Sequence, residues 1–244
     1  MGELIAILSG KGGTGKTSLC AGIASALACL EESVLCIDCD VGLRNLDIAL
    51  GMADTGALSF LDVCNGGYDL DMAACHPEYP KLRFLTAPMN CTAGEIDPVA
   101  FAVMLEQARE KFSYVFLDAP AGIEAGFSLA AKFADRVILV TGADPAAMRD
   151  AFQAGVVLEK MGKNNVRLIV NRVHKKLFGS LDLTVDDIMD KAGLPLLGIV
   201  PEDRHMILAA TRQKPLLKIS KKGASAACRR IAKRLAGLTV PVKI

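Results

Sequence analysis

The chain has 244 residues, of which 52% are hydrophobic, and a formal net charge of +1 at pH 7. This length permits one large domain with a substantial core, and the near-neutral charge gives no global bias toward nucleic acid or acidic ligands. No uninterrupted apolar run approaches the ~18 residues of a membrane-spanning helix, which argues against an integral membrane protein.

The start of the chain and its cysteines point to the cytoplasm. An apolar strand-like segment begins almost at once, without a basic leader, so we expect no signal peptide. Eight cysteines are scattered through apolar segments, which favours a reducing compartment over a disulfide framework. Cys36 and Cys39 form a C-x-x-C pair with two open interpretations: redox or metal chemistry, or two small buried hydrophobes at a strand end.

Apolar runs and helix-forming segments alternate along the chain. We expect strands at 3–9, 34–38, 82–86, 113–118, 135–141, 166–171 and 196–200. We expect helices at 16–30, 97–111, 124–132, 146–161, 184–192, 203–211 and 223–236. The strands are continuous apolar runs, as in a sheet buried on both faces. The alternation predicts an α/β fold, a doubly wound, mostly parallel sheet with helices on both faces, in a single domain spanning residues 1–244.

The segment after the first expected strand matches a phosphate-binding loop. Residues 10–17 read GKGGTGKT and fit the pattern G-x-x-x-x-G-K-[ST] between a strand and a helix. Glycines let several backbone N–H groups face one point, and the following helix adds its positive N-terminal end. Lys16 can then reach the β- and γ-phosphates, and the Thr17 hydroxyl can hold Mg²⁺.

Acidic residues follow other expected strands. Asp38 and Asp40 lie at the end of the second strand, and Asp118 ends the apolar run Tyr114–Leu117. Ligands of a doubly wound sheet bind beyond the carboxyl ends of the strands. Asp118 therefore has the position of a Walker B acid, which supports Mg²⁺ directly or through water.

Lys11 is a second lysine inside the loop, where the generic pattern requires none. With this lysine, the loop resembles the deviant Walker A box of the MinD/ParA family of ATPases. That resemblance implies a P-loop ATPase whose early lysine crosses a dimer interface to the partner's ATP, so that two copies assemble only when nucleotide is present.

Two more segments are similar to the MinD branch of this family. Residues 38–47, DCDVGLRNLD, resemble its switch I, and residues 118–124, DAPAGIE, resemble its switch II. By this resemblance, Asp40 positions the attacking water, and Asp38 orders the water shell of the metal. Asn45 then lies near the dimer interface, and the backbone at Gly122 senses the γ-phosphate.

The base is expected to be adenine, because the N-K-x-D segment of related GTPases is absent from the sequence. Asn171-Arg172 and Pro201-Glu202 follow strands and resemble segments that hold adenine in the family. The expected catalytic residues are Lys11, Lys16 and Asp40, and the expected metal residues are Thr17, Asp38 and Asp118. The expected nucleotide-binding residues are Gly10, Lys11, Gly12, Gly13, Thr14, Gly15, Lys16, Thr17, Ser18, Asn171, Arg172, Pro201 and Glu202.

The resemblance implies a weak ATPase with ATP and Mg²⁺ as cofactors, which acts in the spatial regulation of cell division, including septum site determination. It also implies an ATP-bound homodimer and an activating or effector protein of the division-site system. Members of the branch continue into a basic amphipathic helix that inserts into the inner face of the cell membrane. The sequence ends at Ile244, about where that helix would begin, so membrane association stays open.

Two other functions also stay open. A ParA-like positioning ATPase would need a basic surface for nonspecific DNA, and specific nucleic acid recognition is not expected. An iron–sulfur carrier or reductase of the same superfamily would need cysteines near switch II, and residues 118–126 contain none. The apolar stripe of the segment at 223–236 is expected to pack on the sheet rather than on a membrane.

Overall fold

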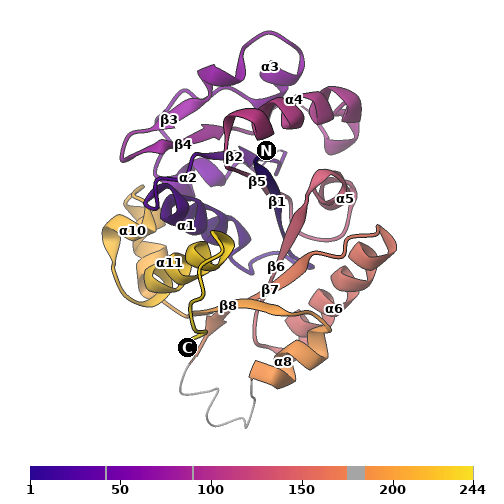
Figure 1. Ribbon diagram of the computed structural model, residues 1–244, viewed down its shortest axis with the longest axis vertical. Helices are drawn as coiled ribbons and strands as arrows, with labels where there is room; N and C mark the ends of the chain where they lie inside the picture. Colours follow the sequence, from indigo (N-terminus) through magenta and orange to yellow (C-terminus); the bar gives the residue numbers. More distant parts are fainter. Residues whose placement is uncertain (42, 90, 175–184, 244) are drawn as a thin grey trace.

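An eight-stranded sheet forms the centre of the protein (Figure 1). The structure is a computed structural model that describes residues 1–41, 43–89, 91–174 and 185–243. The strand order is β3-β4-β2-β5-β1-β6-β7-β8, and only the β3–β4 pair is antiparallel. The strands are β1 (Glu3–Leu8), β2 (Val34–Asp38), β3 (Ala74–His76), β4 (Tyr79–Leu85), β5 (Tyr114–Asp118), β6 (Arg136–Thr141), β7 (Val166–Val173) and β8 (Leu196–Pro201). The expected doubly wound, mostly parallel sheet is confirmed.

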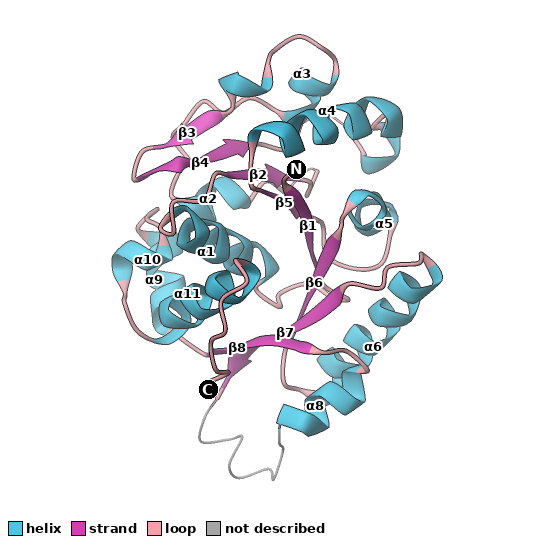
Figure 2. Ribbon diagram, viewed as in Figure 1, coloured by secondary structure: helices cyan, strands magenta, loops and turns pink. Residues whose placement is uncertain are grey.

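Helices cover both faces of this sheet (Figure 2). One face packs against α3 (Phe60–Cys64), α4 (Pro98–Lys111), α5 (Ala125–Phe133), α6 (Pro145–Lys160) and α8 (Val185–Ala192). The other packs against α1 (Lys16–Ala28), α2 (Leu46–Leu50), α9 (Arg204–Thr211), α10 (Leu216–Ile219) and α11 (Gly223–Leu235). Two 3-10 turns, η1 (Leu70–Met72) and η2 (Ala93–Glu95), lie in the connections.

The central strand β1 shows why the strands are uniformly apolar. Leu4, Ala6 and Leu8 belong to the core on one face of the sheet, and Ile5 and Ile7 belong to the core on the other. Successive side chains of a strand point to opposite faces, so a strand covered on both sides must be apolar at every position. The site that follows β1 is thereby anchored in the most buried part of the molecule.

Several short elements differ from the expectation. The edge strand β3 and the helices α2, α3 and α10 were not predicted, and each has five residues or fewer. The expected helix at 184–192 is found as α8, and residue 184 lies outside the described residues. The apolar stripe of α11 packs on the protein core as expected, with Cys228, Ile231 and Leu235 buried. No described helix combines the length and apolar character needed to cross a membrane.

Candidate nucleotide-binding site

The candidate site lies where three neighbouring strands end. β1 lies next to β5, and β5 lies next to β2, so their carboxyl ends share one edge of the sheet. Asp38 and Asp118 are register partners on adjacent parallel strands, which brings two carboxylates to the same point. The phosphate-binding loop follows β1 directly and leads into α1. The chain thus places the predicted loop, which contains Thr17, next to both acids that were predicted as metal residues.

The glycines of the loop serve different purposes. A Cβ on Gly10 would lie 2.5 Å from the backbone oxygen of Asp150, so Gly10 permits close packing of α6. Gly15 has φ +86°, and a Cβ there would collide with the Asn171 amide. Gly13 also has positive φ, at +76°, yet neither it nor Gly12 has a close protein neighbour at its Cβ position. Gly12 and Gly13 therefore leave open the space in which a phosphate would lie.

Lys16 and Asp118 form a buried ion pair at the base of the loop. The Lys16 Nζ lies 3.1 Å from Asp118 Oδ1, and the two side chains are only 6% and 1% exposed. Burial raises the pKa of Asp118, although the Lys16 charge and hydrogen bonds from Thr17 and Lys16 oppose this. The second oxygen, Oδ2, is buried without a hydrogen-bond partner. An unpartnered carboxylate oxygen beside the Thr17 hydroxyl is a suitable ligand for a hard cation.

Asp38 organises the segment that follows β2. Its Oδ1 accepts a hydrogen bond from the Asp40 N–H at 2.9 Å, and its Oδ2 accepts one from the Leu46 N–H at 3.2 Å. Burial, together with the nearby Asp118 charge, raises the pKa of Asp38 to about 7 despite these hydrogen bonds. Asp38 thus ties the start of α2 to the end of β2 and lies next to the second carboxylate.

Asp40 lines a cavity of about 410 Å³ in front of the loop, together with Lys16 and Thr17. Its side chain is half-buried, and burial raises its pKa while the Lys16 charge opposes the increase. Asn45 lines the same cavity, as do the apolar residues Leu43 and Ile48, which the sequence analysis did not identify. The roles expected of Asp40 and Asn45 from the switch I resemblance stay predictions.

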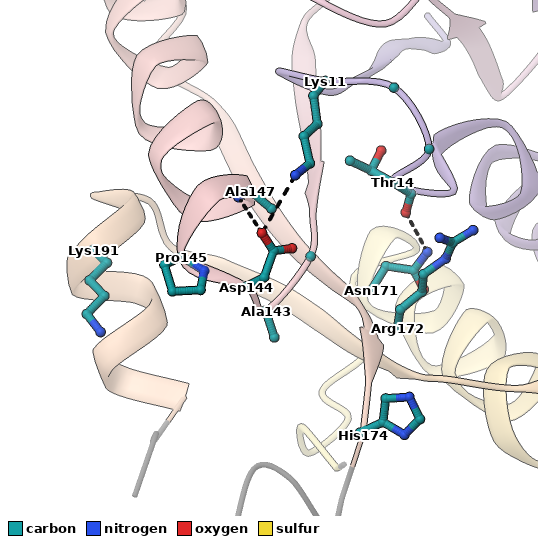
Figure 3. Close-up of a pocket in the computed structure, with 13 residues that line it drawn as sticks. Lys11, Thr14, Ala143, Asp144, Pro145, Ala147, Asn171, Arg172, His174 and Lys191 are labelled. Carbon is teal, nitrogen blue, oxygen red and sulfur yellow. Dashed lines mark hydrogen bonds and ion pairs between the residues drawn. The ribbon is translucent and has the colours of Figure 1, made fainter. Parts of the chain in front are cut away.

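Lys11 extends toward Asp144 at the start of α6 (Figure 3) and does not line the 410 Å³ cavity in front of its own loop. Its Nζ lies 3.6 Å from Asp144 Oδ1, and the two side chains are 41% and 57% exposed. Asp144 also accepts a hydrogen bond from the Ala147 N–H at 2.9 Å and so caps α6. The Ala147 hydrogen bond, followed by the Lys11 charge, outweighs desolvation and lowers the pKa of Asp144. An exposed pair of this kind contributes only ~0.2–1 kcal/mol, so Lys11 is free to exchange its partner.

Asn171, in β7 on the other side of β1, holds the phosphate loop through a hydrogen bond. Its Nδ2 donates to the Thr14 carbonyl at 2.7 Å, and its side chain is buried (Figure 3). The neighbouring Arg172 has φ +57°, a conformation that costs a non-glycine residue free energy. Arg172 borders three cavities around the loop. Asn171 was expected beside adenine, which stays a prediction; in the structure its amide nitrogen supports the phosphate loop.

A cavity of about 280 Å³ lies beside the loop at the end of β8. It contains the expected residues Ser18, Asn171, Arg172, Pro201 and Glu202. Its apolar side comes from Met206, Ile207 and Ala210 of α9, which the sequence analysis missed. A flat base next to the phosphate loop would find both apolar and polar partners there. The sequence did contain a signal for this apolar wall: apolar residues lie near the start of the helix that follows the predicted strand at 196–200.

Gly122, in the segment that resembles switch II, is hydrogen-bonded to the residue before the phosphate loop. It has φ +95°, with no close neighbour at its Cβ position, and its N–H donates to the Ser9 carbonyl at 3.1 Å. The left-handed conformation is what requires glycine at this position. The backbone expected to sense a γ-phosphate is therefore hydrogen-bonded to the segment that precedes the loop.

These observations fit a magnesium nucleotide. Gly12, Gly13, Lys16, Thr17 and Asp40 line one cavity. The buried Asp118, with its unpartnered oxygen, pairs with Lys16 of this lining, and the buried Asp38 accepts a hydrogen bond from the Asp40 N–H. Carboxylate and hydroxyl oxygens are the ligands that Mg²⁺ prefers. The Cys36 and Cys39 pair has no such surroundings: both side chains are buried, and among the described residues neither belongs to a group of three or more histidine, cysteine or acidic side chains that could hold a metal ion.

The fold and site define a P-loop nucleotide-binding protein, and comparison with known proteins agrees. Residues 5–216 match the family model for the CobQ/CobB/MinD/ParA nucleotide binding domain. The chain belongs to this family, whose MinD and ParA members are P-loop ATPases.

MinD proteins are among the relatives and solved structures to which the chain is similar. The chain is 37% identical to the septum site-determining protein MinD of Synechocystis sp., over 99% of this chain and 92% of that protein. It is 36% identical to MinD of Bacillus subtilis, over 100% of this chain and 92% of that protein. The MinC:MinD cell division protein complex of Aquifex aeolicus has a chain with a TM-score of 0.91 and 35% identity, covering 99% of this chain and 98% of that one. MinD of Pyrococcus horikoshii, solved with Mg-ADP, has a TM-score of 0.83 and 26% identity, covering 96% of each chain.

Proposed function

We propose that this chain is a MinD-type ATPase that dimerises on ATP and takes part in placing the division site. ATP and Mg²⁺ are its ligands, in keeping with the Mg-ADP bound by the Pyrococcus horikoshii relative. The observation that carries the proposal is the position of Lys11. Its ammonium group lies outside its own phosphate cavity and is held by an exposed, easily exchanged partner.

Hydrolysis in this site requires a positioned water and neutralised charge rather than a covalent intermediate. We assign the water to Asp40, which borders the phosphate cavity. Lys16 and the loop amides would bind the β- and γ-phosphates, and Lys16 would leave Asp118 to do so. Thr17, Asp38 and Asp118 would hold Mg²⁺, which would offset the negative charge of the phosphates.

Lys11 would complete the site of a second copy. A cavity of about 900 Å³ lies between the loop and α6, and Lys11, Gly12 and Asp144 border it. Two copies that face each other through this region would bring each Lys11 toward the partner's nucleotide. Asn45 and Gly122, in the two switches, would then report the γ-phosphate to the interface. ATP hydrolysis would be slow until a partner protein binds and completes the site.

We extend the proposal to partners and location. An effector of the division-site system is expected, since the Aquifex aeolicus relative was solved as a MinC:MinD complex. We place the protein in the cytoplasm, with peripheral association at the inner face of the cell membrane as a further possibility to test. We also treat residues 1–244 as one P-loop ATPase domain, because a single sheet joins elements from both ends of the chain.

The decisive test is Lys11→Ala. This variant should lose ATP-dependent dimerisation and keep nucleotide binding, because Lys16 still serves its own nucleotide. Light scattering coupled to size exclusion measures the dimer, and fluorescence of a labelled ATP analogue measures binding. The matched control is Lys191→Ala, which removes a lysine from the same cavity at a distance from the loop. An unchanged ATP dimer in Lys11→Ala would refute the assignment of Lys11.

A further inference from the structure

The distribution of charge in the chain is strongly uneven. Every formally charged side chain from Arg204 to Lys243 is basic, whereas the rest of the chain carries more acids than bases. The net charge of +1 is therefore the sum of a basic C-terminal segment and an acidic remainder. The folded protein collects part of this basic charge around a cavity that the nucleotide site does not use.

This cavity has a volume of about 530 Å³ and lies at the C-terminal end of α1, against the β3–β4 hairpin, α10 and α11. Four of its side chains are basic, namely Lys81, Lys218, Lys221 and Arg229. Lys218 pairs with Glu78 at 2.6 Å. Within the described part of the chain, the other three form no ion pair.

Tyr79 lines the cavity and has a hydroxyl without a hydrogen-bond partner in the described structure. The residue is 6% exposed, and its hydroxyl oxygen is buried. Burial raises the pKa of Tyr79 to about 12, although the Arg229 charge opposes the increase. The hydroxyl is therefore protonated at neutral pH and is a donor without an acceptor. Leaving such a group unsatisfied is unfavourable, and a ligand with acceptor oxygens would relieve the cost.

The acidic surroundings balance only part of the positive charge. Glu31 and Glu78 also border the cavity, and the C-terminal end of α1 carries a partial negative charge. These features offset Lys218 and one further cation. They leave at least one full positive charge among Lys81 of β4, Lys221 between α10 and α11, and Arg229 of α11, with Tyr79 beside Lys81 on β4.

We propose that this cavity binds a phosphoryl group, held by Lys81, Lys221 and Arg229 and by a hydrogen bond that Tyr79 donates. A phosphoryl group offers several acceptor oxygens at once, and a guanidinium fork matches two of them. A carboxylate has fewer oxygens for four donor side chains. The ligand is either a free phosphorylated molecule or the headgroup of an anionic lipid, because both present the same chemistry.

The site is separate from the nucleotide site. The phosphate-binding loop ends in the first two residues of α1, whereas the cavity includes Ala28, the last residue of that helix. A 13-residue helix is about 20 Å long, so one bound nucleotide does not fill both sites. Occupation of the cavity is thus independent of the proposed ATPase function.

The test observes Tyr79 directly. The chain has three tyrosines, so labelling their Cζ with ¹³C gives a small set of resonances, with Tyr68 and Tyr114 as internal controls. The full chain is saturated with Mg-ADP, to fill the nucleotide site, and titrated with inorganic phosphate. The Tyr79 resonance should shift and saturate while the other two stay in place. A parallel flotation assay uses vesicles of phosphatidylglycerol in phosphatidylcholine.

Two double variants separate the cavity from general charge. Lys221→Gln with Arg229→Gln should weaken phosphate or vesicle binding at least about tenfold, since two charge-assisted contacts are lost. Lys214→Gln with Lys233→Gln removes the same charge from exposed positions outside the cavity and should change binding less than about twofold. A Tyr79 response to phosphate identifies a free ligand, and vesicle binding lost only in the cavity variant identifies a lipid headgroup. Equal loss in both variants, or no response to either probe, would overturn the proposal.

Discussion

At the scale of single residues, the glycines of the phosphate loop separate a packing role from a ligand role. Gly10 lies against the backbone of α6, where a Cβ would be 2.5 Å from the Asp150 oxygen. Gly12 has only the Ala121 Cβ, at 3.9 Å, near its own Cβ position. Two glycines of one motif therefore have different physical roles: Gly10 allows close packing, and Gly12 leaves space for a ligand.

This difference predicts opposite outcomes for two alanine variants. Gly10→Ala should lower the free energy of unfolding of the nucleotide-free protein by about 2 kcal/mol, because rigid backbone must move. Gly12→Ala should change that free energy by less than ~0.5 kcal/mol and weaken nucleotide binding or ATP-dependent dimerisation. Urea unfolding measures the first effect, and ligand titration with sizing measures the second. Equal loss of stability in both variants would show that the loop glycines are not divided in this way.

The sequence was sufficient to identify the residues of the site but not their partners. Lys16, Asp38 and Asp118 were predicted from a loop motif and from the acids at strand ends, since those signals are local. The pairing of Lys11 with Asp144, and of Asn171 with the Thr14 carbonyl, depends on which strands are neighbours. No local pattern carries that information. The apolar wall from Met206 and Ile207 was missed for the same reason.

At the scale of elements, the length of a segment decided whether it was predictable. Buried parallel strands such as β5 and β6 are continuous apolar runs, and long helices such as α4 begin with a capping acid and proline. The edge strand β3 has three residues and a register shift between Cys75 and His76. Helices of four or five residues, such as α2 and α10, are too short to show a helical period. Tertiary contacts, not local pattern, fix these elements.

One such contact predicts a pH dependence. His76 is buried, its Nε2 lies 2.8 Å from the Leu50 carbonyl at the end of α2, and its Nδ1 accepts from the Glu78 N–H at 3.0 Å. Burial lowers the pKa of His76 below 6.5, although the Leu50 carbonyl opposes the decrease. The unfolded chain therefore binds the proton more readily. The stability contributed by neutral His76 is present above pH 6.5 and is lost as the pH falls toward the lowered pKa.

Urea unfolding between pH 7.5 and 5 tests this expectation. The free energy of unfolding should fall more steeply with decreasing pH in the native chain than in His76→Gln, which has no ring to protonate. His174→Gln is the matched control, because that side chain is exposed, and it should retain the native slope. Identical slopes for the native chain and His76→Gln would exclude a contribution from His76.

At the scale of the whole molecule, the candidate site joins the two halves of the sheet. The loop after β1 and the acids after β2 and β5 come from the first half of the chain, and Asn171, Pro201 and α9 come from the second. Neighbouring parallel strands need a crossover, so such a site requires the complete central sheet. This is why the alternation of elements predicted both the fold and the edge at which the site lies. The distance between the two halves of the site was not predictable from this alternation.

Nucleotide binding should therefore protect segments that are distant in sequence but gathered at one edge. With Mg-ADP at about 100 times its Kd, the free energy of unfolding should rise by about 2.7 kcal/mol. Hydrogen exchange should slow in the loop, in residues 38–41 and 43–46 and in α9, and stay unchanged in β3, the strand at the far end of the sheet. Lys16→Ala should show neither effect, since it removes the main phosphate contact. Protection confined to the loop would mean that the second half of the sheet takes no part in holding the nucleotide.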